Sequence, residues 1–154
     1  MEETMLKDAH KNEIRYKLFN YDLLIVWKPE YELGIPIIDE QHRGIVTTIN
    51  SLYYGMQHNY GKEILAPIAD MVYNYTRIHF QTEESFLKKI DFPNAEKHHD
   101  LHRALSSKLA EVERDSLLNS DPYEFMNFLR SWWINHICKE DLIYRDYFLS
   151  SLEE

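Results

Sequence analysis

Residues 68–86 read IADMVYNYTRIHFQTEESF, and this stretch decides the fold. Apolar and aromatic side chains recur in it at steps of three or four residues, which places them on one face of an α-helix. The series that starts at Ile68 and Val72 continues through His79 and Glu83, so the same face carries a histidine and a carboxylate. The stretch therefore predicts an amphipathic helix whose buried face includes two residues able to bind a metal.

Three further segments have the same helical design. They run over 37–58, from about Asn94 to 119, and from Pro122 onward. Short connections between helices of this kind are typical of a bundle, and 154 residues are enough for one domain but too few for two ordinary ones. We therefore predict an all-α fold, an up-down-up-down four-helix bundle over residues 21–154, with residues 1–20 as an N-terminal arm.

Local signals set the predicted ends of these helices. Gly61 suits the left-handed position past the end of the first helix, and Pro67 suits the start of the second, which should end around Ile90. Residues 119–122 combine a helix cap with a proline at the first helical position. The apolar segment 20–36 contains two prolines and a glycine, so we expect it to be extended and to lie across the ends of the bundle.

The composition limits the classes of function. The formal net charge is −9 and there are no basic runs, which argues against nucleic acid or anionic membrane surfaces as partners. The single cysteine, Cys138, excludes an internal disulfide framework and fits a reducing compartment. The acidic N-terminus is unlike a signal peptide, and no apolar run is long enough to span a bilayer. We therefore expect a cytoplasmic protein.

Five histidines and two acids fall on the four predicted helices, in phase with the apolar faces. Residues four apart lie on the same side of a helix, so pairs at this spacing can converge on a metal. A single buried histidine is usually a hydrogen-bonded core residue, but five at once need partners. Imidazoles with carboxylates suit iron, zinc or copper, and seven ligands are a natural number for two ions. The seven are His42, His79, Glu83, His98, His102, His136 and Asp141.

The last acid of this set is ambiguous from spacing alone. Asp141 follows His136 by five residues, which on a regular helix turns it about 140° away. Glu140 follows by four residues and is the better placed carboxylate on a regular helix. A local bulge would instead favour Asp141, and such bulges are frequent at functional sites. The spacing therefore leaves both acids open.

The chain resembles the hemerythrin family, and in particular the bacterial hemerythrins. The matching motifs are Trp27…Tyr31-x-x-Gly34-Ile35…Ile38-Asp39-x-Gln41-His42, His79-Phe80-x-x-Glu83-Glu84, His98-x-x-x-His102 and Trp132…His136-Ile137-x-x-x-Asp141. One departure is Asp91, which stands before Phe92-Pro93 where many relatives have glycine, and aspartate tolerates a left-handed turn. In the family the final acid is five residues past the histidine, so the resemblance favours Asp141.

The resemblance implies a centre of two non-heme iron ions joined by an oxo or hydroxo bridge. It assigns His98, His102 and His136 to one iron, His42 and His79 to the other, and Glu83 and Asp141 to both. The first iron then has six ligands and the second has five, which leaves one position open for a small molecule. By position, that vacancy should face an apolar pocket of Ile45, Phe80, Trp132, Trp133 and Ile137. Tyr144 should lie a little further along the last helix. The alternative is that these residues are simply core, as most of them would be in any bundle.

The ligand implied by the family is O2, bound reversibly for storage, delivery or sensing, without enzymatic turnover. Two alternatives stay open: a di-iron redox enzyme of the oxidase, peroxidase or nitric oxide-handling type, and a sensory module that signals to a partner through the arm. Ferritin-like oxidases use a carboxylate-rich ligand set, unlike this histidine-rich one. Gln41, Asp39 and Glu84 are candidates to hydrogen-bond ligand N–H groups, whereas His10, His58 and His99 are expected at the surface or beside the ligands.

Overall fold

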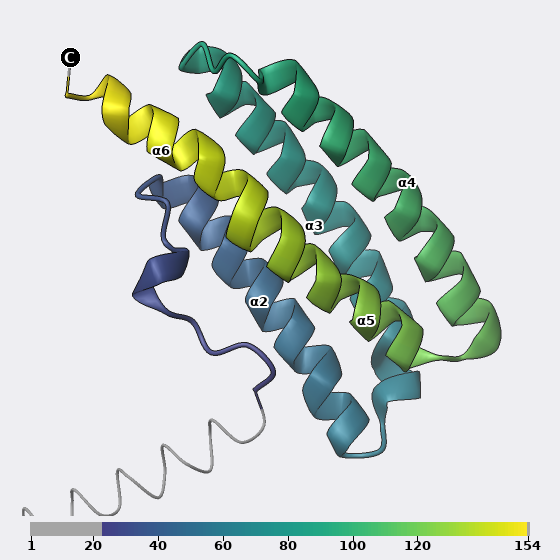
Figure 1. The fold of residues 1–154 in the computed structure, drawn as a ribbon. Helices are drawn as coiled ribbons and strands as arrows, with labels where there is room; N and C mark the ends of the chain where they lie inside the picture. The colour runs from purple at the N-terminus through teal and green to yellow at the C-terminus, as the bar shows by residue number, and fades with distance from the viewer. Residues whose placement is uncertain (1–22, 154) are drawn as a thin grey trace, which may run out of the picture.

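The computed structural model describes residues 23–153, so the predicted arm over 1–20 lies outside the described residues. Four long helical rods lie side by side, and successive rods run in opposite directions (Figure 1). They are α2 (Pro36–Gln57), α3 (Gly61–Lys89), α4 (Ala95–Asn119) and a fourth rod made of α5 (Pro122–Trp132), η2 (Trp133–Glu140) and α6 (Asp141–Ser151). A short 3-10 helix, η1 (Pro29–Tyr31), precedes them, and residues 23–153 contain no strand. The predicted all-α four-helix bundle is confirmed.

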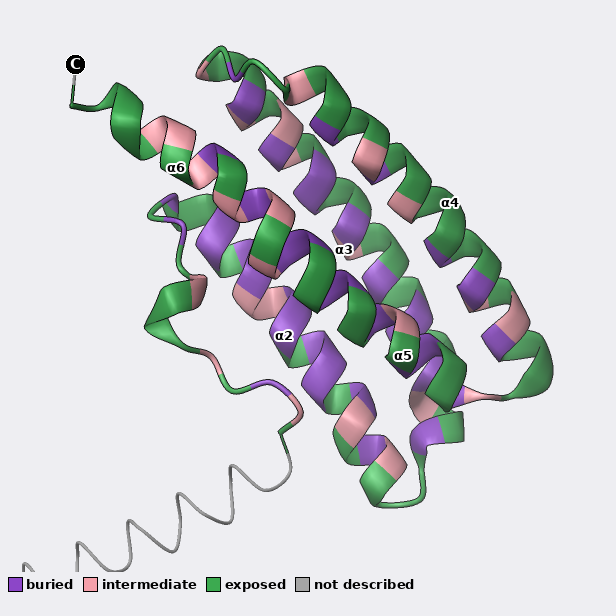
Figure 2. Cartoon of the chain, in the orientation of Figure 1, coloured by how far each residue is buried: buried purple, intermediate pink, exposed green. Residues whose placement is uncertain are grey.

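The buried residues form stripes on the inner faces of the rods (Figure 2). They make two apolar clusters, a larger one that includes Ile45 and a smaller one at the other end of the bundle that includes Ile38. His42 lies between these two isoleucines on α2, and Glu83 lies between Phe80 and Leu87 of the two clusters on α3. A layer of buried polar residues therefore separates two apolar halves.

Two of the predicted helix ends were wrong. Asn59, and not Gly61, takes the left-handed conformation past α2, with φ of 64°. Gly61 is the first residue of α3, where a Cβ would lie 2.8 Å from Cγ of Met56, so close packing is what requires glycine there. Pro67 lies inside α3 and not near its start. The helix continues through this exposed proline because the apolar face on either side of it, with Leu65, is buried.

Two other turn signals were read correctly. Asp121 is the N-cap of α5, where its carboxylate accepts a hydrogen bond from the Tyr123 N–H at 2.9 Å, and Pro122 is the first helical residue. Asp91, in the turn between α3 and α4, has φ of 52°, the left-handed conformation that its residue type tolerates. Short side chains that suit these backbone conformations thus set both turns.

Residues 23–35, before α2, run along the side of the bundle and not across its ends, which corrects the prediction for 20–36 over its described part (Figure 1). At one end, Asn50 of α2 accepts hydrogen bonds from the N–H groups of Leu24 and Ile25 at 3.0 and 2.9 Å, and its amide donates to the Ile25 carbonyl at 2.8 Å. No strand lies beside this segment within the described part of the chain. A side chain of α2 therefore supplies the hydrogen-bond partners of its backbone N–H and C=O groups.

At the other end of the segment, Asp39 of α2 holds the chain as it enters the helix. Its carboxylate accepts hydrogen bonds from the N–H of Leu33 at 2.7 Å and of Gly34 at 3.1 Å. Gly34 has φ of 78°, a conformation that favours glycine. Asp39 is therefore a structural residue of this segment and not the partner of a ligand histidine.

Replacing Asn50 with alanine is expected to lower the free energy of unfolding by about 3 kcal/mol, because three hydrogen bonds are lost and buried peptide groups are left without partners. Urea unfolding followed by circular dichroism measures the change. Asn74→Ala is the matched control, since the Asn74 amide bonds to Asp70 on the exposed face of α3, and it should shift the free energy by no more than about 0.5 kcal/mol. Equal losses in the two variants would contradict the anchoring role of Asn50.

Candidate metal centre

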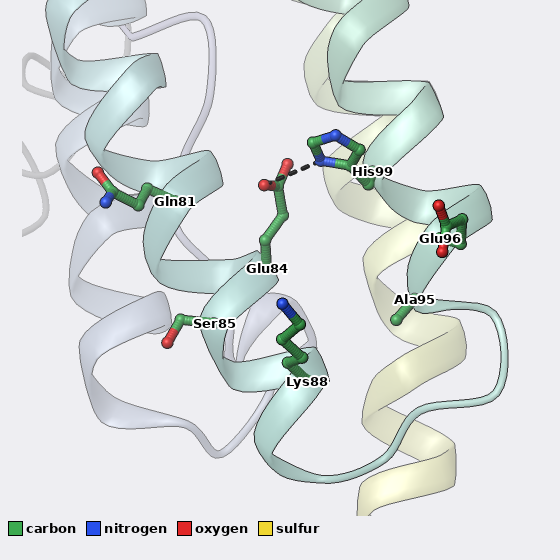
Figure 3. A pocket seen from close by; sticks show the side chains of 7 residues that line it. All are labelled: Gln81, Glu84, Ser85, Lys88, Ala95, Glu96 and His99. Atoms are coloured by element: carbon green, nitrogen blue, oxygen red, sulfur yellow. Dashed lines mark ion pairs between the residues drawn. The ribbon is translucent and has the colours of Figure 1, made fainter.

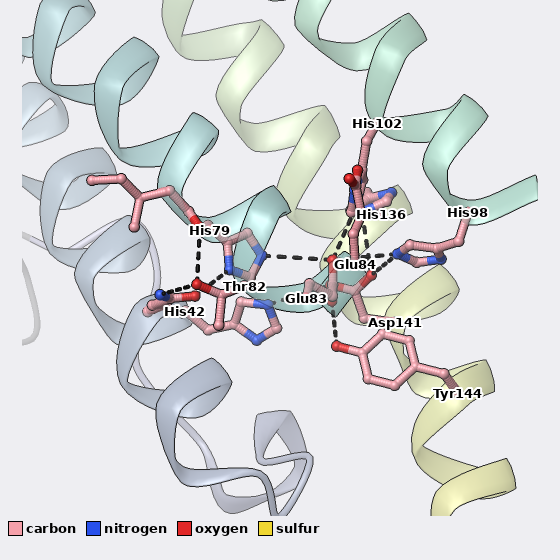
Figure 4. Close-up of polar contacts among 12 residues, drawn as sticks. His42, His79, Thr82, Glu83, Glu84, His98, His102, His136, Asp141 and Tyr144 are labelled. Atoms are coloured by element: carbon pink, nitrogen blue, oxygen red, sulfur yellow. Dashed lines mark hydrogen bonds and ion pairs between the residues drawn. The ribbon is translucent and has the colours of Figure 1, made fainter. Parts of the chain in front are cut away.

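The seven sequence-predicted ligands meet in the polar layer at the middle of the bundle (Figure 4). None of their side chains is more than 4% exposed. The rod α2 supplies His42, α3 supplies His79 and Glu83, α4 supplies His98 and His102, and the fourth rod supplies His136 and Asp141. All four rods therefore contribute to one buried site.

The π-helical segment η2 determines which acid enters the layer. The N–H of Asp141 donates to the carbonyl of His136, five residues earlier, where an α-helix would bond four residues back. Asp141 is thereby turned to the same side as His136, and its Oδ1 lies 3.2 Å from the His136 Nε2. Glu140 is partly exposed and lines a surface hollow with Lys97 and Ile143. Regular α-helix geometry favoured Glu140 as the acid that points into the layer. Asp141 does so instead, because the helix is π-helical here.

The ligand atoms form two groups that share Glu83. In each group, one ligand atom from every residue lies within 4.8 Å of the others. One group is Glu83, His98, His102 and His136, and the other is His42, His79, Glu83 and Asp141. Asp141 also reaches the first group, because its Oδ1 is 3.3 Å from the His98 Nε2 while its Oδ2 is 3.3 Å from the His42 Nε2. The histidines are thus divided three and two, with both acids between them.

Besides the Nδ1 of His42, four buried atoms of these residues have no hydrogen-bond partner among residues 23–153: the Nε2 atoms of His42 and His79 and both carboxylate oxygens of Asp141. Buried polar atoms without partners are rare and destabilising. A cation between the side chains of a group would satisfy them, because neutral imidazole nitrogen and carboxylate oxygen are both metal donors. The site therefore fits metal ions of the iron, zinc or copper type.

The charges in the layer follow from burial and from close pairing. Burial would raise the pKa of Glu83, but hydrogen bonds from His102 and His98 hold it well below its usual range. Burial would likewise lower the pKa of His98, but the carboxylates of Asp141 and Glu83, each with an oxygen 3.3 Å from its Nε2, raise it to about 10. Burial lowers the pKa of His79 to about 4. At neutral pH His79 is therefore in the neutral form that binds a metal, whereas His98 carries a proton that a metal must displace.

Gln41 orients the ring of His79 from outside the layer. Its Oε1 lies 3.0 Å from the His79 Nδ1, and its Nε2 donates to the Thr82 Oγ1 at 3.0 Å. A partner on Nδ1 leaves Nε2 as the atom that faces the metal. Gln41 was among the candidates for this role from the sequence, while Thr82, which fixes the amide in turn, was missed.

Glu84 links a buried ligand to the surface. Its Oε1 is 2.8 Å from the Nδ1 of His102, and its Oε2 is 3.0 Å from the Nδ1 of His99, whose side chain is 49% exposed. Figure 3 shows the Glu84–His99 pair beside a hollow between α3 and α4. The carboxylate therefore holds the His102 ring, and His99 contacts this carboxylate and not the metal layer.

Tyr144 has a contact that the sequence did not reveal. Its hydroxyl donates a hydrogen bond to Oε1 of Glu83, 61 residues away in sequence (Figure 4). Burial, together with the nearby charge of Glu83, raises the pKa of Tyr144 well above its ordinary value, so it stays a neutral donor. Only its helical spacing from His136 and Asp141 hinted at this position, and spacing does not identify a partner.

The five residues predicted to form the ligand pocket are all buried: Ile45, Phe80, Trp132, Trp133 and Ile137. The ring of Phe80 stacks on His102, with centroids 3.8 Å apart and planes 7° apart. The ring of Trp133 packs edge-on against His42, with centroids 6.4 Å apart. Tyr31, in the segment before α2, covers Trp133 from outside. The walls of the layer are therefore apolar and shielded from water.

None of the helices within residues 23–153 is both long enough and apolar enough to cross a membrane.

Comparisons with known proteins agree with this geometry. A family model described as "Hemerythrin HHE cation binding domain" matches residues 33–147. A bacteriohemerythrin of Stenotrophomonas maltophilia is 30% identical over 124 residues, which cover 80% of this chain and 80% of that protein. A bacteriohemerythrin of Pseudomonas aeruginosa is 29% identical over 133 residues, covering 84% and 85%. A hemerythrin polypeptide of Sipunculus nudus is 26% identical over 121 residues, covering 79% and 91%.

The matched region takes in all of α2, α3, α4, α5 and η2 and the first part of α6, which begins with Asp141, and thus every residue of the buried layer. The chain belongs to the hemerythrin family.

Proposed function

We propose that this chain binds O2 reversibly at a non-heme di-iron centre, for oxygen storage, delivery or sensing. The observation that carries the proposal is the buried layer of nitrogen and oxygen ligands in two groups that share Glu83. Seven ligands divided in this way suit two ions close together and leave one ion with fewer protein ligands than the other. Membership of the hemerythrin family supports iron as the metal and O2 as the ligand.

In this proposal the residues hold the metals as follows. His98, His102 and His136 would bind one iron, His42 and His79 would bind the other, and Glu83 and Asp141 would be shared between them. The pair would supply electrons and an open coordination position for a small ligand. Gln41 and Glu84 keep the His79 and His102 rings in place through their Nδ1 atoms.

The chain itself limits the access of water and protons to the bound ligand. Phe80, Trp133 and Ile137 present apolar walls and have no acidic group. Tyr144 is held by Glu83, so its proton is already engaged. Such a pocket favours release of the ligand unchanged over its further reduction, which is why we propose a binding protein and not an enzyme.

An anaerobic titration of the reduced, iron-loaded protein with O2 tests the proposal. We expect a colourless protein that gains a visible charge-transfer band and loses it when O2 is removed, with two irons per chain by metal analysis. Immediate irreversible oxidation would instead support the alternative of a di-iron redox enzyme. Absence of any O2-dependent band from a protein that holds two irons would contradict both.

A further inference from the structure

A small cavity lies next to the metal-binding layer, between α2, α3 and α5. Ile45, Thr76 and Trp132 are among the residues that line it, one from each helix. Each stands three or four residues from a histidine of the layer on its own rod, which is about one helical turn, or roughly 5.4 Å. The cavity volume is about 10 Å³. That is close to the smallest space that accommodates a water molecule.

Two polar groups on residues that line this cavity have no hydrogen-bond partner among residues 23–153. They are the hydroxyl of Thr76 and the indole Nε1 of Trp132, and both residues are only 4% exposed. The neighbouring hydroxyl of Thr48, in the same wall, is different because it donates to the Gly44 carbonyl at 2.9 Å. Leaving a buried donor unpaired destabilises a fold. Two such groups beside one small cavity therefore indicate a ligand that pairs with both.

We propose that this cavity is a binding site for a single water molecule, which accepts a hydrogen bond from Trp132 Nε1 and pairs with Thr76 Oγ1. An indole can only donate, whereas a hydroxyl both donates and accepts, and water matches the two at once. An apolar diatomic molecule would leave both groups unpaired. Water-mediated bonds of this kind are nearly as favourable as direct ones.

Trp132 also explains how this water exchanges with solvent. The same side chain lines an open groove of about 450 Å³ between α4 and α5, together with Lys108 and Asn135. The indole therefore borders both the groove and the small cavity, and we expect a movement of this one side chain to connect them.

The position of the water gives it a regulatory role. It is a source of protons beside the apolar ligand pocket, since Ile45 and Trp132 belong to both the pocket and the cavity wall. We therefore expect the water to limit the lifetime of the oxygenated protein. This regulatory part rests on the proposed function, whereas the water site itself does not.

The first test is a high-resolution crystal structure of the metal-loaded protein and of its variants. We expect a water peak within about 3 Å of both Thr76 Oγ1 and Trp132 Nε1, present in the wild type and in Thr47→Val, and absent from Thr76→Val. Thr47→Val is the matched control because Thr47 is exposed on α2 and its hydroxyl bonds to the Arg43 carbonyl. Trp132→Phe is a second variant that should also lose the peak. A wild-type cavity without density at this position would overturn the proposal.

The second test is the half-life of the oxygenated form in air-saturated buffer. We expect it to lengthen severalfold in Thr76→Val and to stay unchanged in Thr47→Val. If the wild type shows the water peak but has the same half-life as Thr76→Val, the regulatory role is overturned and the water site stands. A wild-type protein that forms no oxygenated state would overturn the proposed function, and the crystallographic peak would still decide the water site.

Discussion

Asp141→Ala is expected to reduce the iron content from two ions per chain to one or none, whereas Glu140→Ala should keep both. Asp141 is fully buried between the two ligand groups, with one oxygen 3.3 Å from His98 and the other 3.3 Å from His42. Its removal takes one oxygen donor from each proposed iron. Glu140 is only partly buried and lies outside both groups.

Iron per chain, measured after anaerobic loading and desalting, distinguishes the two variants. Far-ultraviolet circular dichroism of each variant before loading shows whether the helices have formed, so that loss of metal is not confused with loss of fold. If Glu140→Ala lost iron and Asp141→Ala kept it, the α-helical register would be the better guide to this site, and the π-helical segment would not be retained in solution.

The contrast between these two acids shows where sequence patterns stop being informative. Helical periodicity placed His42, His79 and His102 on buried faces, because a regular helix converts spacing into direction. The same rule selected Glu140, but in this segment the backbone bonds five residues back, from the N–H of Asp141 to the carbonyl of His136. A π-turn is a backbone event without a residue type of its own, so only the family resemblance indicated Asp141.

The other contacts that the sequence did not predict share a physical cause. Asn50 and Asp39 bond to the backbone of a segment that precedes α2, and Tyr144 bonds to Glu83 of another helix. Thr76 and Trp132 meet at one cavity from two helices. These contacts join separate elements, and they depend on how those elements pack and not on the preferences of either residue. The sequence predicted the faces of the helices but could not predict which polar atoms meet across them.

His79→Ala is expected to abolish reversible O2 binding and to remove the iron of the group that has two histidines. His79 is fully buried, its Nε2 has no hydrogen-bond partner within the described chain, and its low pKa of about 4 keeps it ready to bind a metal at neutral pH. Without it, His42 is the only imidazole of that group. The three histidines of the other group are untouched, so one iron per chain should remain.

The measurement is the O2-dependent charge-transfer band together with the iron content of the same sample. His58→Ala is the control, since His58 is an exposed histidine at the end of α2, and it should keep both the band and two irons. A His79→Ala protein that still bound O2 reversibly would show that the open coordination position is not at the iron held by His42 and His79. Because the group with three histidines would then carry the ligand, the roles proposed for the two irons would have to be exchanged.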